Sequence, residues 1–581
     1  MWWIAWAICG LAVVRIIRNI TSFYKNLQWA RGSGLPYVWS PCGRLDFLWI
    51  LVHKPLKPLL RRLPSGLGGF GEHNALGWWF DGDYQTLQLH RRLGKTFINV
   101  TPGMSELHVA DPDVAQQVFK RKWDFDRDAD QMSHAKFFGE SLVSVTGQEW
   151  ARHRRISAAP FNESIHELVW NEAVRQTRQM SEYWSCHGEE GFSTTLEDLN
   201  TVTLNVFAKA SLGRAWDFCK ADDIKRRAEI EGEFEATGSN TATASTMWTY
   251  RDSLFFVTQN IVAYVMLPDW LLAAPAWVVP PPIKRFVTAW RDLGEYFRRA
   301  VDKTKQQIKD GDVQRNPSVI SYLVNKSEEV RREEAVVSGS AGKPQQGFKD
   351  SDIYGTLFAL NQTGHDTSKS VLGSAIYLLA AYPDLQDWIC EQLVSVDPAG
   401  NKVYVETFHR LTRCLAVMNE SLRLYPPIPM VYRSTIGPAG QDLIIDGRTV
   451  HIPPKTFVIP NITAAATHPE FWGDLHNTSW RPRRWIDPTT DELRSPSSVA
   501  DAFFPFAAGP RGCIGKKFAQ VEFVAILSTL LTGYRIEVVP RAGEGIGAAR
   551  ERCADTVRRS EMELTVQMTD ASSVTLRLIA R

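Results

Sequence analysis

Residues 503–523, FFPFAAGPRGCIGKKFAQVEF, decide the fold because they place a single cysteine among glycines in front of an amphipathic helix. The glycines permit tight turns and let the backbone approach a flat ligand closely. Cys513 stands at the start of the predicted helix, whose dipole favours a thiolate, and Arg511 offers a cation to a carboxylate. A cysteine without such neighbours is usually a small buried apolar side chain. Here the pattern predicts a thiolate presented to a metal macrocycle.

The composition is that of a folded globular protein. Of the 581 residues, 44% are hydrophobic and 22% are charged, which excludes intrinsic disorder for most of the chain. The formal net charge is only +2, so the chain has no broad basic field of the kind that nucleic-acid binding requires. Eight cysteines without a CxxC pair are too sparse for a disulfide scaffold, and this usage is typical of a reducing compartment.

The first residues predict an uncleaved membrane anchor. The apolar run reaches Ile20, or about 30 Å of helix, if Arg15 and Arg18 extend toward the lipid headgroups. Positive charge follows this run instead of preceding it, which disfavours a cleaved signal peptide and places the bulk of the chain in the cytosol. We therefore predict an anchor at 1–20, a membrane-proximal linker at 21–66 and one large domain at 67–581. The alternative for the anchor is a helix lying flat in the membrane interface.

Hydrophobic periodicity predicts a mainly α-helical fold with a small β subdomain. Residues 97–119 indicate two short strands and a helix capped near Asp111, and residues 430–464 indicate further strands. Long helical patterns fill 148–330 and 349–426, and the C-terminus from Met562 has the pattern of a hairpin. Residues 338–349 and 541–550 have the composition of exposed loops.

Residues 254–282 are strongly apolar but are interrupted by Asp269 and several prolines, which disfavours a second membrane span. Two alternatives remain open for this segment. It is either a buried helix and loop, or an apolar surface that dips into a bilayer and is formed by Trp270, Leu271, Leu272, Trp277 and Val278.

The cysteine motif resembles the signature Phe-x-x-Gly-x-Arg-x-Cys-x-Gly of the cytochrome P-450 superfamily of haem-thiolate monooxygenases. All five fixed positions match, at Phe506, Gly509, Arg511, Cys513 and Gly515. The resemblance implies the P-450 fold, an α-helical triangular prism, with haem b as cofactor. It also implies that Cys513 is the axial ligand of the iron, that Phe506 packs near the sulfur, and that Arg511 binds a haem propionate. Thiolate ligation favours cleavage of the O–O bond.

A second resemblance lies inside the long helix predicted from about Asp350. Residues 363–368, TGHDTS, are similar to the oxygen-activating stretch of the family, which implies that Asp366 and Thr367 relay protons through water. Thr363 departs from the family, which usually has Ala or Gly there, so the role of its hydroxyl stays open. The internal glycine and the hydroxyl groups predict that the helix kinks or opens. An ordinary helix with a polar stripe is the alternative.

Further matches follow the order of the family motifs. Glu420 and Arg423 resemble its Glu-x-x-Arg pair, and Arg484 would complete the triad; because two arginines already neutralise the carboxylate, we expect a structural role. Trp150 and Arg154 match a Trp-x-x-x-Arg motif and share one helical face. By family position these two, together with Arg433, would contact a propionate.

The resemblance implies a monooxygenase that inserts one atom of O2 into a lipophilic small molecule. No flavin module is present, and the glycines of residues 543–548 lack the following helix and parallel strand of a dinucleotide site. Electrons from NADPH would then arrive through a flavoprotein reductase, for which Arg152, Arg155, Lys516 and Lys517 are candidate docking residues. The candidate pocket walls are the loop before Trp150 with Phe137 and Phe138, the helix around Phe358 and Asn361, and the segment after Pro427.

The anchor and the long insertions resemble eukaryotic, and specifically fungal, members that work in secondary metabolism. By the same analogy the protein would be a single-pass protein of the endoplasmic reticulum membrane with a cytosolic catalytic domain. Two alternative functions would use the same haem site. One is a haem-thiolate isomerase or dehydratase that needs no external electrons, and the other is a non-catalytic haem-based sensor or carrier.

Overall fold

The structure is a computed structural model of the chain. The residues that it describes are 2–40, 56, 59, 85–128, 136–218, 248–261, 264, 267–275, 277–311, 317–337, 347–398, 400–473, 478–499, 501–562 and 565–581. The chain forms two compact units. The sheet unit contains residues 1–128, 419–513 and 555–569, and the helical unit contains residues 129–418, 514–554 and 570–581.

The sheet unit is built on one six-stranded mixed sheet in the order β1-β2-β3-β8-β5-β4. Its strands are β1 (Tyr37–Trp39), β2 (Thr96–Val100), β3 (Glu106–Val109), β4 (Phe125–Asp126), β5 (Arg433–Thr435) and β8 (Phe457–Pro460). The β1–β2 and β3–β8 pairs are parallel, and the other pairs are antiparallel. Strands β2, β3 and β8 are buried along their whole length, as expected where both faces are covered. Two hairpins, β6 (Gln441–Ile445) with β7 (Arg448–Ile452) and β10 (Glu561–Met562) with β11 (Val566–Gln567), belong to the same unit.

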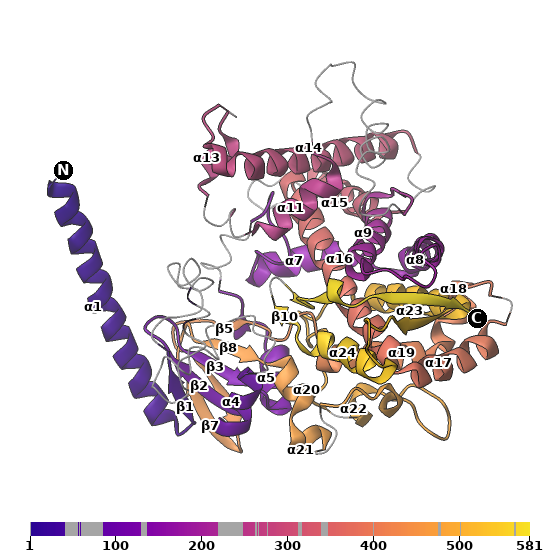
Figure 1. The fold of residues 1–581 in the computed structure, drawn as a ribbon. Helices are drawn as coiled ribbons and strands as arrows, with labels where there is room; N and C mark the ends of the chain where they lie inside the picture. The colour runs from indigo at the N-terminus through magenta and orange to yellow at the C-terminus, as the bar shows by residue number, and fades with distance from the viewer. Residues whose placement is uncertain are drawn as a thin grey trace. The chain divides into compact units, whose positions relative to one another are not determined.

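Short helices and one long helix accompany this sheet. Helix α5 (Pro112–Lys120) begins at the cap Asp111, whose carboxylate accepts hydrogen bonds from the backbone N–H groups of Asp113 and Val114. Its buried face joins the strands and Phe504 in one apolar core. The N-terminal helix α1 (Trp2–Ser33) packs its C-terminal end against β2 (Figure 1). The remaining elements of the unit are α4 (Gln85–Leu93), α20 (Ile462–Thr467), α21 (Pro469–Trp472), the 3-10 helix η5 (Pro482–Trp485) and α22 (Pro496–Val499).

The helical unit packs around the long helix α16 (Asp350–Ala381), which is buried along most of its length. Helix α9 (Thr195–Leu212) lies along α16, and α8 (Glu163–Ser185) lies against both α9 and α23 (Lys516–Gly533). Further helices are α7 (Gly147–Ala158), α11 (Tyr250–Gln259), α13 (Asp269–Ala273), α14 (Pro281–Lys309), α15 (Val319–Val337), α17 (Pro383–Val396), α18 (Tyr404–Thr407) and the 3-10 helices η4 (Phe408–Arg410) and η6 (Ala571–Ser573). Helices α19 (Thr412–Leu424) and α24 (Ile546–Arg558) run from one unit into the other.

The predicted fold class is confirmed: the chain is mainly helical with a small mixed sheet. The predicted strands and capped helix at 97–119 correspond to β2, β3 and α5, and the strands predicted at 430–464 correspond to β5 to β8. Helix α1 continues past Ile20 to Ser33, into the segment predicted as a linker, of which residues 41–55, 57–58 and 60–66 lie outside the described residues. Among the residues that the structure describes, no helix is long and apolar enough to cross a bilayer.

Two local predictions near the C-terminus are wrong. Residues 541–550 are not all loop, because α24 begins at Ile546; Ala549, Cys553 and Val557 recur at helical spacing and are buried. The end of the chain is not a single hairpin, because β12 (Leu576–Ala580) pairs antiparallel with β9 (Tyr534–Val538). A helix therefore does follow the glycines of 543–548, but the next strand on β9 runs antiparallel, which a dinucleotide-binding unit does not have.

The apolar segment 254–282 divides between the two alternatives. Helix α11 buries Leu254 and Val257, as a core helix does. Farther on, Trp270 is 64% exposed and Trp277 is 86% exposed. Of the residues predicted to form an apolar surface, Trp270, Trp277 and Val278 are exposed, whereas Leu271 and Leu272 are buried, so the predicted surface is present only in part.

Candidate active site

The cysteine motif forms a compact turn in the sheet unit. The backbone N–H of Cys513 donates to the Phe506 carbonyl over 2.9 Å, and that of Gly512 donates to the Gly509 carbonyl over 3.0 Å. Gly509 has φ +66°, and a Cβ there would overlap the Phe119 carbonyl at the end of α5. Glycine is therefore required for both reasons, and the turn lies directly on α5.

Cys513 differs from the two buried cysteines among the described residues. Cys414 and Cys553 are buried, and burial raises the pKa of each thiol to about 12, so both are neutral thiols. Cys513 and Cys186 are both exposed and take part in no disulfide. Cys186 ends the helix α8, whereas Cys513 stands on the turn that Gly509 fixes against α5, so the Cys513 sulfur is held in place as a metal ligand requires.

A cluster of three arginines lies in the same unit. Arg511 forms an ion pair with Asp126, with Nη2 2.5 Å from Oδ1. Arg433 on β5 is buried, and burial together with Arg127 and Arg511 lowers the pKa of its guanidinium to about 9. Burial and Arg511 likewise lower the pKa of Arg127 to about 10. Three cations around one carboxylate leave an excess of positive charge, which favours an anionic ligand with more than one carboxylate.

The predicted triad is also assembled within the sheet unit. Glu420 and Arg423 are both fully buried, and Arg423 donates from Nε to Oε2 over 3.0 Å and from Nη2 to Oε1 over 2.9 Å. Arg484 donates from Nε to Oε1 over 3.1 Å, and the Trp485 indole donates to Oε2 over 2.8 Å. Burial opposes the ionised form, but Arg423 and Arg484 outweigh it and hold the pKa of Glu420 below its ordinary value. With both oxygens used in this way, the carboxylate holds neighbouring segments together and is a poor base.

Asp366, Thr363 and Thr367 lie on α16 in the helical unit. Asp366 is buried and accepts from the Lys369 ammonium over 2.7 Å. The Thr367 hydroxyl donates to the Thr363 carbonyl over 2.8 Å, and the Thr363 hydroxyl donates to the Ala359 carbonyl over 2.7 Å. Both hydroxyl groups thus turn back to the carbonyl four residues earlier.

The predicted opening of α16 is not present, because the helix runs unbroken from Asp350 to Ala381. The internal glycine has a packing role instead. A Cβ at Gly364 would overlap the Phe207 ring on α9, so glycine lets the two helices approach. Of the remaining predicted residues, Trp150 on α7 is buried and Arg154 is half-buried.

Comparison with known proteins agrees with these motifs. The family model described as cytochrome P-450 matches residues 79–545. The chain belongs to the cytochrome P-450 family. A cytochrome P-450 monooxygenase of Arthrobotrys oligospora is 25% identical over 98% of this chain and 97% of its own. A phomenoic acid biosynthesis cluster cytochrome P-450 monooxygenase of Leptosphaeria maculans is 26% identical over 91% of each chain. A human cytochrome P-450 is 23% identical over 75% of this chain and 76% of its own.

The protein is therefore a cytochrome P-450 monooxygenase, and its motifs can be compared with the haem-thiolate cofactor that the family implies. The residues of the sheet unit fit that cofactor. Cys513 would supply a sulfur ligand, the glycine turn would keep side chains away from a flat macrocycle, and the arginine cluster would suit two propionates. Phe506 is half-buried and holds the Cys513 N–H through its carbonyl. Gly515 is the N-cap of α23, which begins at Lys516.

Sequence reasoning missed two residues of this P-450. Arg127 directly follows Asp126 on β4, and only the sheet, which pairs β4 with β5, brings it to Arg433. Glu522 on α23 is fully buried, and neither of its carboxylate oxygens has a hydrogen-bond partner among the described residues. Burial raises its pKa to about 8, opposed by the facing Ser368 hydroxyl on α16. A single acidic residue in an apolar helix such as FAQVEFVAIL was the available signal.

Proposed function

We propose that this cytochrome P-450 inserts one oxygen atom of O2 into a C–H or C=C bond of a lipophilic small molecule. The other oxygen atom leaves as water, and the two electrons and one of the two protons come from NADPH by way of a separate flavoprotein reductase. Haem, when bound, supplies the one-electron chemistry that splits dioxygen. The observation that carries this proposal is the accessible Cys513 sulfur in the same unit as the arginine cluster.

The residues of the sheet unit hold and tune the cofactor in this proposal. Cys513 binds as a thiolate, and the N–H groups of the turn keep its backbone fixed. Arg127, Arg433 and Arg511 bind the propionates, and Asp126 orients Arg511. Trp150 and Arg154 are proposed to contribute further donors to a propionate, as the family motif implies. Glu420, Arg423 and Arg484 hold the surrounding scaffold.

An aromatic wall in the helical unit supports a lipophilic substrate. Phe138 stacks on Trp290 of α14 with ring centroids 3.8 Å apart, and it contacts Phe358 of α16 at 5.3 Å. Phe137 contacts the same Phe358 at 5.4 Å. Phe358 and Trp290 are buried behind the half-exposed Phe137 and Phe138, which are the rings that a lipophilic scaffold would contact. Asn361, in contrast, is fully buried and accepts from the Tyr250 hydroxyl over 2.7 Å, so it shapes the wall from behind.

Asp366 and Thr367 are proposed to move protons toward the site of oxygen chemistry. The Lys369 ammonium donates to the Asp366 carboxylate over 2.7 Å and fixes the position from which Asp366 would exchange protons with water. Asp366→Asn should lower kcat and raise the solvent isotope effect on kcat while leaving the KM for substrate unchanged. An unchanged kcat and isotope effect would remove Asp366 from the proton path.

The reductase is proposed to dock on basic residues of the helical unit. Of the four predicted residues, Arg155 and Lys516 are exposed. Arg152 is engaged with Glu149 and the Gly347 carbonyl, and Lys517 lies over the Phe408 ring at 4.1 Å. Lys516→Glu should therefore slow reductase-supported turnover and weaken its dependence on salt, whereas Lys303→Glu on α14 serves as the matched surface control.

Residues 1–20 are proposed as the membrane anchor, with the catalytic domain on the cytosolic face of the endoplasmic reticulum. The support is the row of exposed apolar side chains on α1 between Trp6 and Ile20. A secondary-metabolic role is proposed because the Leptosphaeria maculans relative belongs to a phomenoic acid biosynthesis cluster.

The test is to coexpress the protein with a reductase and search extracts for molecules that gain one oxygen. Under isotopically heavy O2, the product should carry one heavy oxygen, and one NADPH should be consumed for each product formed. Product without NADPH consumption would indicate an isomerase or dehydratase. Haem and ligand binding without any product would indicate a sensor or carrier. Either outcome contradicts the proposed reaction.

A further inference from the structure

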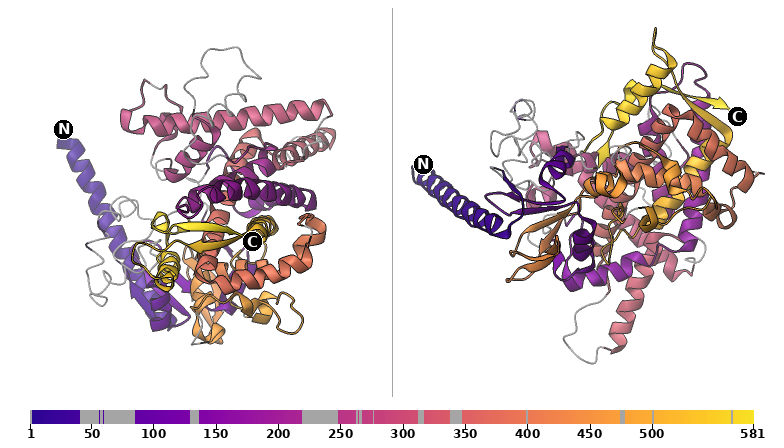
Figure 2. Two further views of the ribbon diagram at one scale, coloured as in Figure 1. Left: turned by 45° about the vertical axis from the view of Figure 1, so that its right-hand side comes forward. Right: turned by 90° about the horizontal axis from the view of Figure 1, so that it is seen from below.

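The N-terminal helix α1 is one unbroken element that has two different surroundings. It runs from Trp2 to Ser33, which at 1.5 Å per residue is about 48 Å. It is a single straight helix in every view (Figure 2). Gly10, where a helix most easily bends, does not interrupt it.

The C-terminal half of α1 is bonded to the sheet unit at several separate points. The Ser22 hydroxyl donates to the Gly103 carbonyl over 3.1 Å, and the Asn26 amide donates to the carbonyls of Thr101 and Gly103, each over 3.0 Å. One turn later, the Trp29 indole donates to the His451 carbonyl over 2.9 Å. These contacts lie at helical spacing on one face of α1 and reach both the β2–β3 turn and β7.

Apolar packing and the helix end fix the same half. Ala30 is fully buried, and Phe23, Leu27 and Trp29 pack against the main core of the sheet unit. Directly after the helix, the Arg448 guanidinium donates to the Gly34 carbonyl over 2.8 Å. A helix held by direct hydrogen bonds, a buried face and a clamp at its end does not swing as a free tether.

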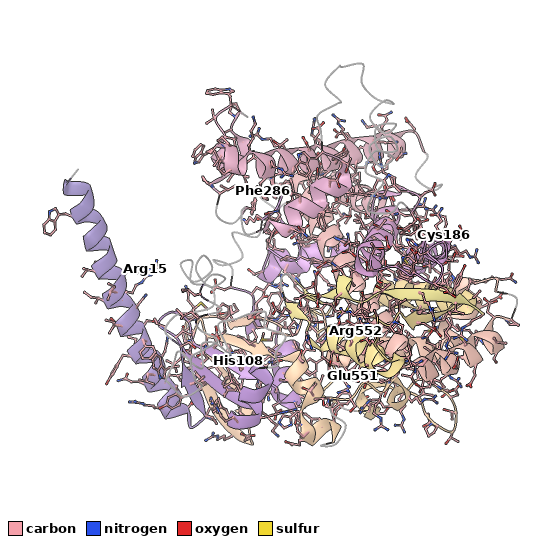
Figure 3. The ribbon with its side chains drawn as sticks, in the orientation of Figure 1. Arg15, His108, Cys186, Phe286, Glu551 and Arg552 are labelled. Atoms are coloured by element: carbon pink, nitrogen blue, oxygen red, sulfur yellow. The ribbon has the colours of Figure 1, made fainter. Side chains whose placement is uncertain are left out.

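The N-terminal half has the opposite character. The large apolar side chains that the structure describes in this half are 54% to 73% exposed, namely Trp6, Val13, Val14, Ile16, Ile17 and Ile20. At the helical spacing they lie on one broad face of α1, and Arg15 and Arg18 lie on the opposite face, an arrangement that suits contact of the apolar face with lipid. Both arginines are exposed, and Arg15 projects from the part of α1 that has left the sheet (Figure 3). Long basic side chains at such positions reach toward lipid headgroups.

We propose that α1 is a rigid stalk that joins the sheet unit to a lipid bilayer and fixes the tilt at which that unit meets the bilayer. This proposal rests on the membrane association in the proposed function. Because the stalk is continuous helix from the lipid half to the docked half, the sheet unit turns with its anchor. The segment from Thr21 to Ser33 is then part of the catalytic domain and not a linker.

The test measures the distance between two spin labels in the holoenzyme in lipid nanodiscs. One label, introduced as an unnatural amino acid, replaces Val14 in the lipid half, and the other replaces the exposed Ile444 on β6. A rigid stalk should give one narrow distance distribution. The double variant Asn26→Ala, Trp29→Phe should broaden it at least twofold, whereas Gln28→Ala, on the exposed face of α1, should leave it unchanged.

A wild-type distribution as broad as that of the double variant would overturn the proposal, and so would a double variant that stays narrow. Should the double variant fail to retain haem, the wild-type width alone decides. Flotation of the same labelled protein with liposomes reports membrane association separately. Failure of the anchor proposal therefore shows as loss of flotation, and failure of the stalk proposal shows as a broad distribution in protein that still floats.

Discussion

Arg127 is brought to the other arginines of the candidate active site by the pairing of β4 with β5 and not by a sequence motif. Its guanidinium shares a buried corner with Arg433 and Arg511, and the pKa of Arg127 is lowered to about 10 by burial and by Arg511. Burial and the neighbouring Arg511 destabilise the charged form of Arg127, so an anion that binds beside the guanidinium stabilises it. Arg127 belongs to none of the sequence motifs, so no local pattern marks it.

Arg127→Leu should weaken haem retention by about tenfold or more, because a charge-assisted hydrogen bond contributes about 1.5 to 3 kcal/mol. The measurement is the rate at which haem transfers to an acceptor such as apomyoglobin. Arg121→Leu is the control, because Arg121 pairs with Asp124 and with a carbonyl on β6. Equal haem transfer from both variants would show that Arg127 does not contact a propionate.

The ionisation of Glu522 makes the stability of the helical unit depend on pH. Its pKa is raised by burial from its ordinary value near 4.5 to about 8. Below pH 4.5 the folded and unfolded states both hold the proton, so the residue makes no difference to the free energy of unfolding. Between pH 4.5 and 8 only the folded state holds it, so stability falls as pH rises. Above pH 8 Glu522 is ionised in both states, and the full unfavourable free energy of its buried charge lowers the stability of the folded state.

Glu522→Gln should therefore raise stability at pH 8 by an amount on the order of 4 kcal/mol and have little effect at pH 4.5. Denaturant unfolding at the two pH values measures this. Glu406→Gln, at an exposed position on α18, should show no such difference. A Glu522→Gln variant that gains nothing on going from pH 4.5 to pH 8 would contradict the neutral state of Glu522.

At the scale of elements, the contact between α9 and α16 depends on Gly364. A helical Gly→Ala change ordinarily stabilises by about 1 kcal/mol, but here the added Cβ overlaps the Phe207 ring. Overpacking costs about 1 to 3 kcal/mol, so Gly364→Ala should be destabilising on balance. Phe207→Leu combined with Gly364→Ala should recover part of the loss. Gly547→Ala on α24, where nothing lies within 4 Å, should not destabilise.

Gly364 also shows why the sequence did not predict correctly whether α16 opens. The motif around Asp366 correctly marked the family, but a glycine and two threonines in a helix do not reveal whether the helix opens. The threonine hydroxyls bond back to carbonyls of an intact helix, and the glycine serves the neighbouring α9. In α24, buried Ala549 and Cys553 outweigh the glycines that suggested a loop. Both outcomes depend on tertiary contacts that a single segment does not encode.

At the scale of the whole molecule, two buried histidines make the protein sensitive to acid. Burial is the largest cause that lowers the pKa of His90 to about 3 and that of His153 to about 4. Above pH 6.5 both histidines are neutral in the folded and the unfolded states. Between pH 6.5 and 4 the unfolded chain binds protons that the folded chain does not, so stability falls as pH falls. His90 lies in the sheet unit and His153 in the helical unit, so both units are affected.

Thermal unfolding should therefore show Tm falling steadily from pH 6.5 to pH 4. His90→Asn together with His153→Asn should flatten this dependence by several degrees, whereas His409→Asn, at an exposed position, should not. A Tm profile that is equally steep in the double variant would show that other groups control acid unfolding.

Across the whole chain, hydrophobic periodicity was enough to predict the mainly helical fold, and five short motifs were enough to predict the enzyme class. They succeeded because Cys513 and its glycines must lie in one continuous turn, which a sequence displays directly. Arg433 and Arg511 were predicted from the motifs, but Arg127 was not, since it reaches them only through the pairing of β4 with β5. The burial of Glu522 was missed because it depends on the helices that pack around α23. The continuation of α1 to Ser33 was missed for a similar reason, because its docked face is satisfied by carbonyls of the sheet.

The most direct test of the central claim is the absorption spectrum of the purified, reduced holoprotein under carbon monoxide. Thiolate ligation by Cys513 predicts the long-wavelength Soret maximum typical of cysteine-bound haem, and Cys513→Ser should abolish that maximum. A wild-type maximum typical of nitrogen ligation, or a Cys513→Ser protein with an unchanged spectrum, would contradict the account.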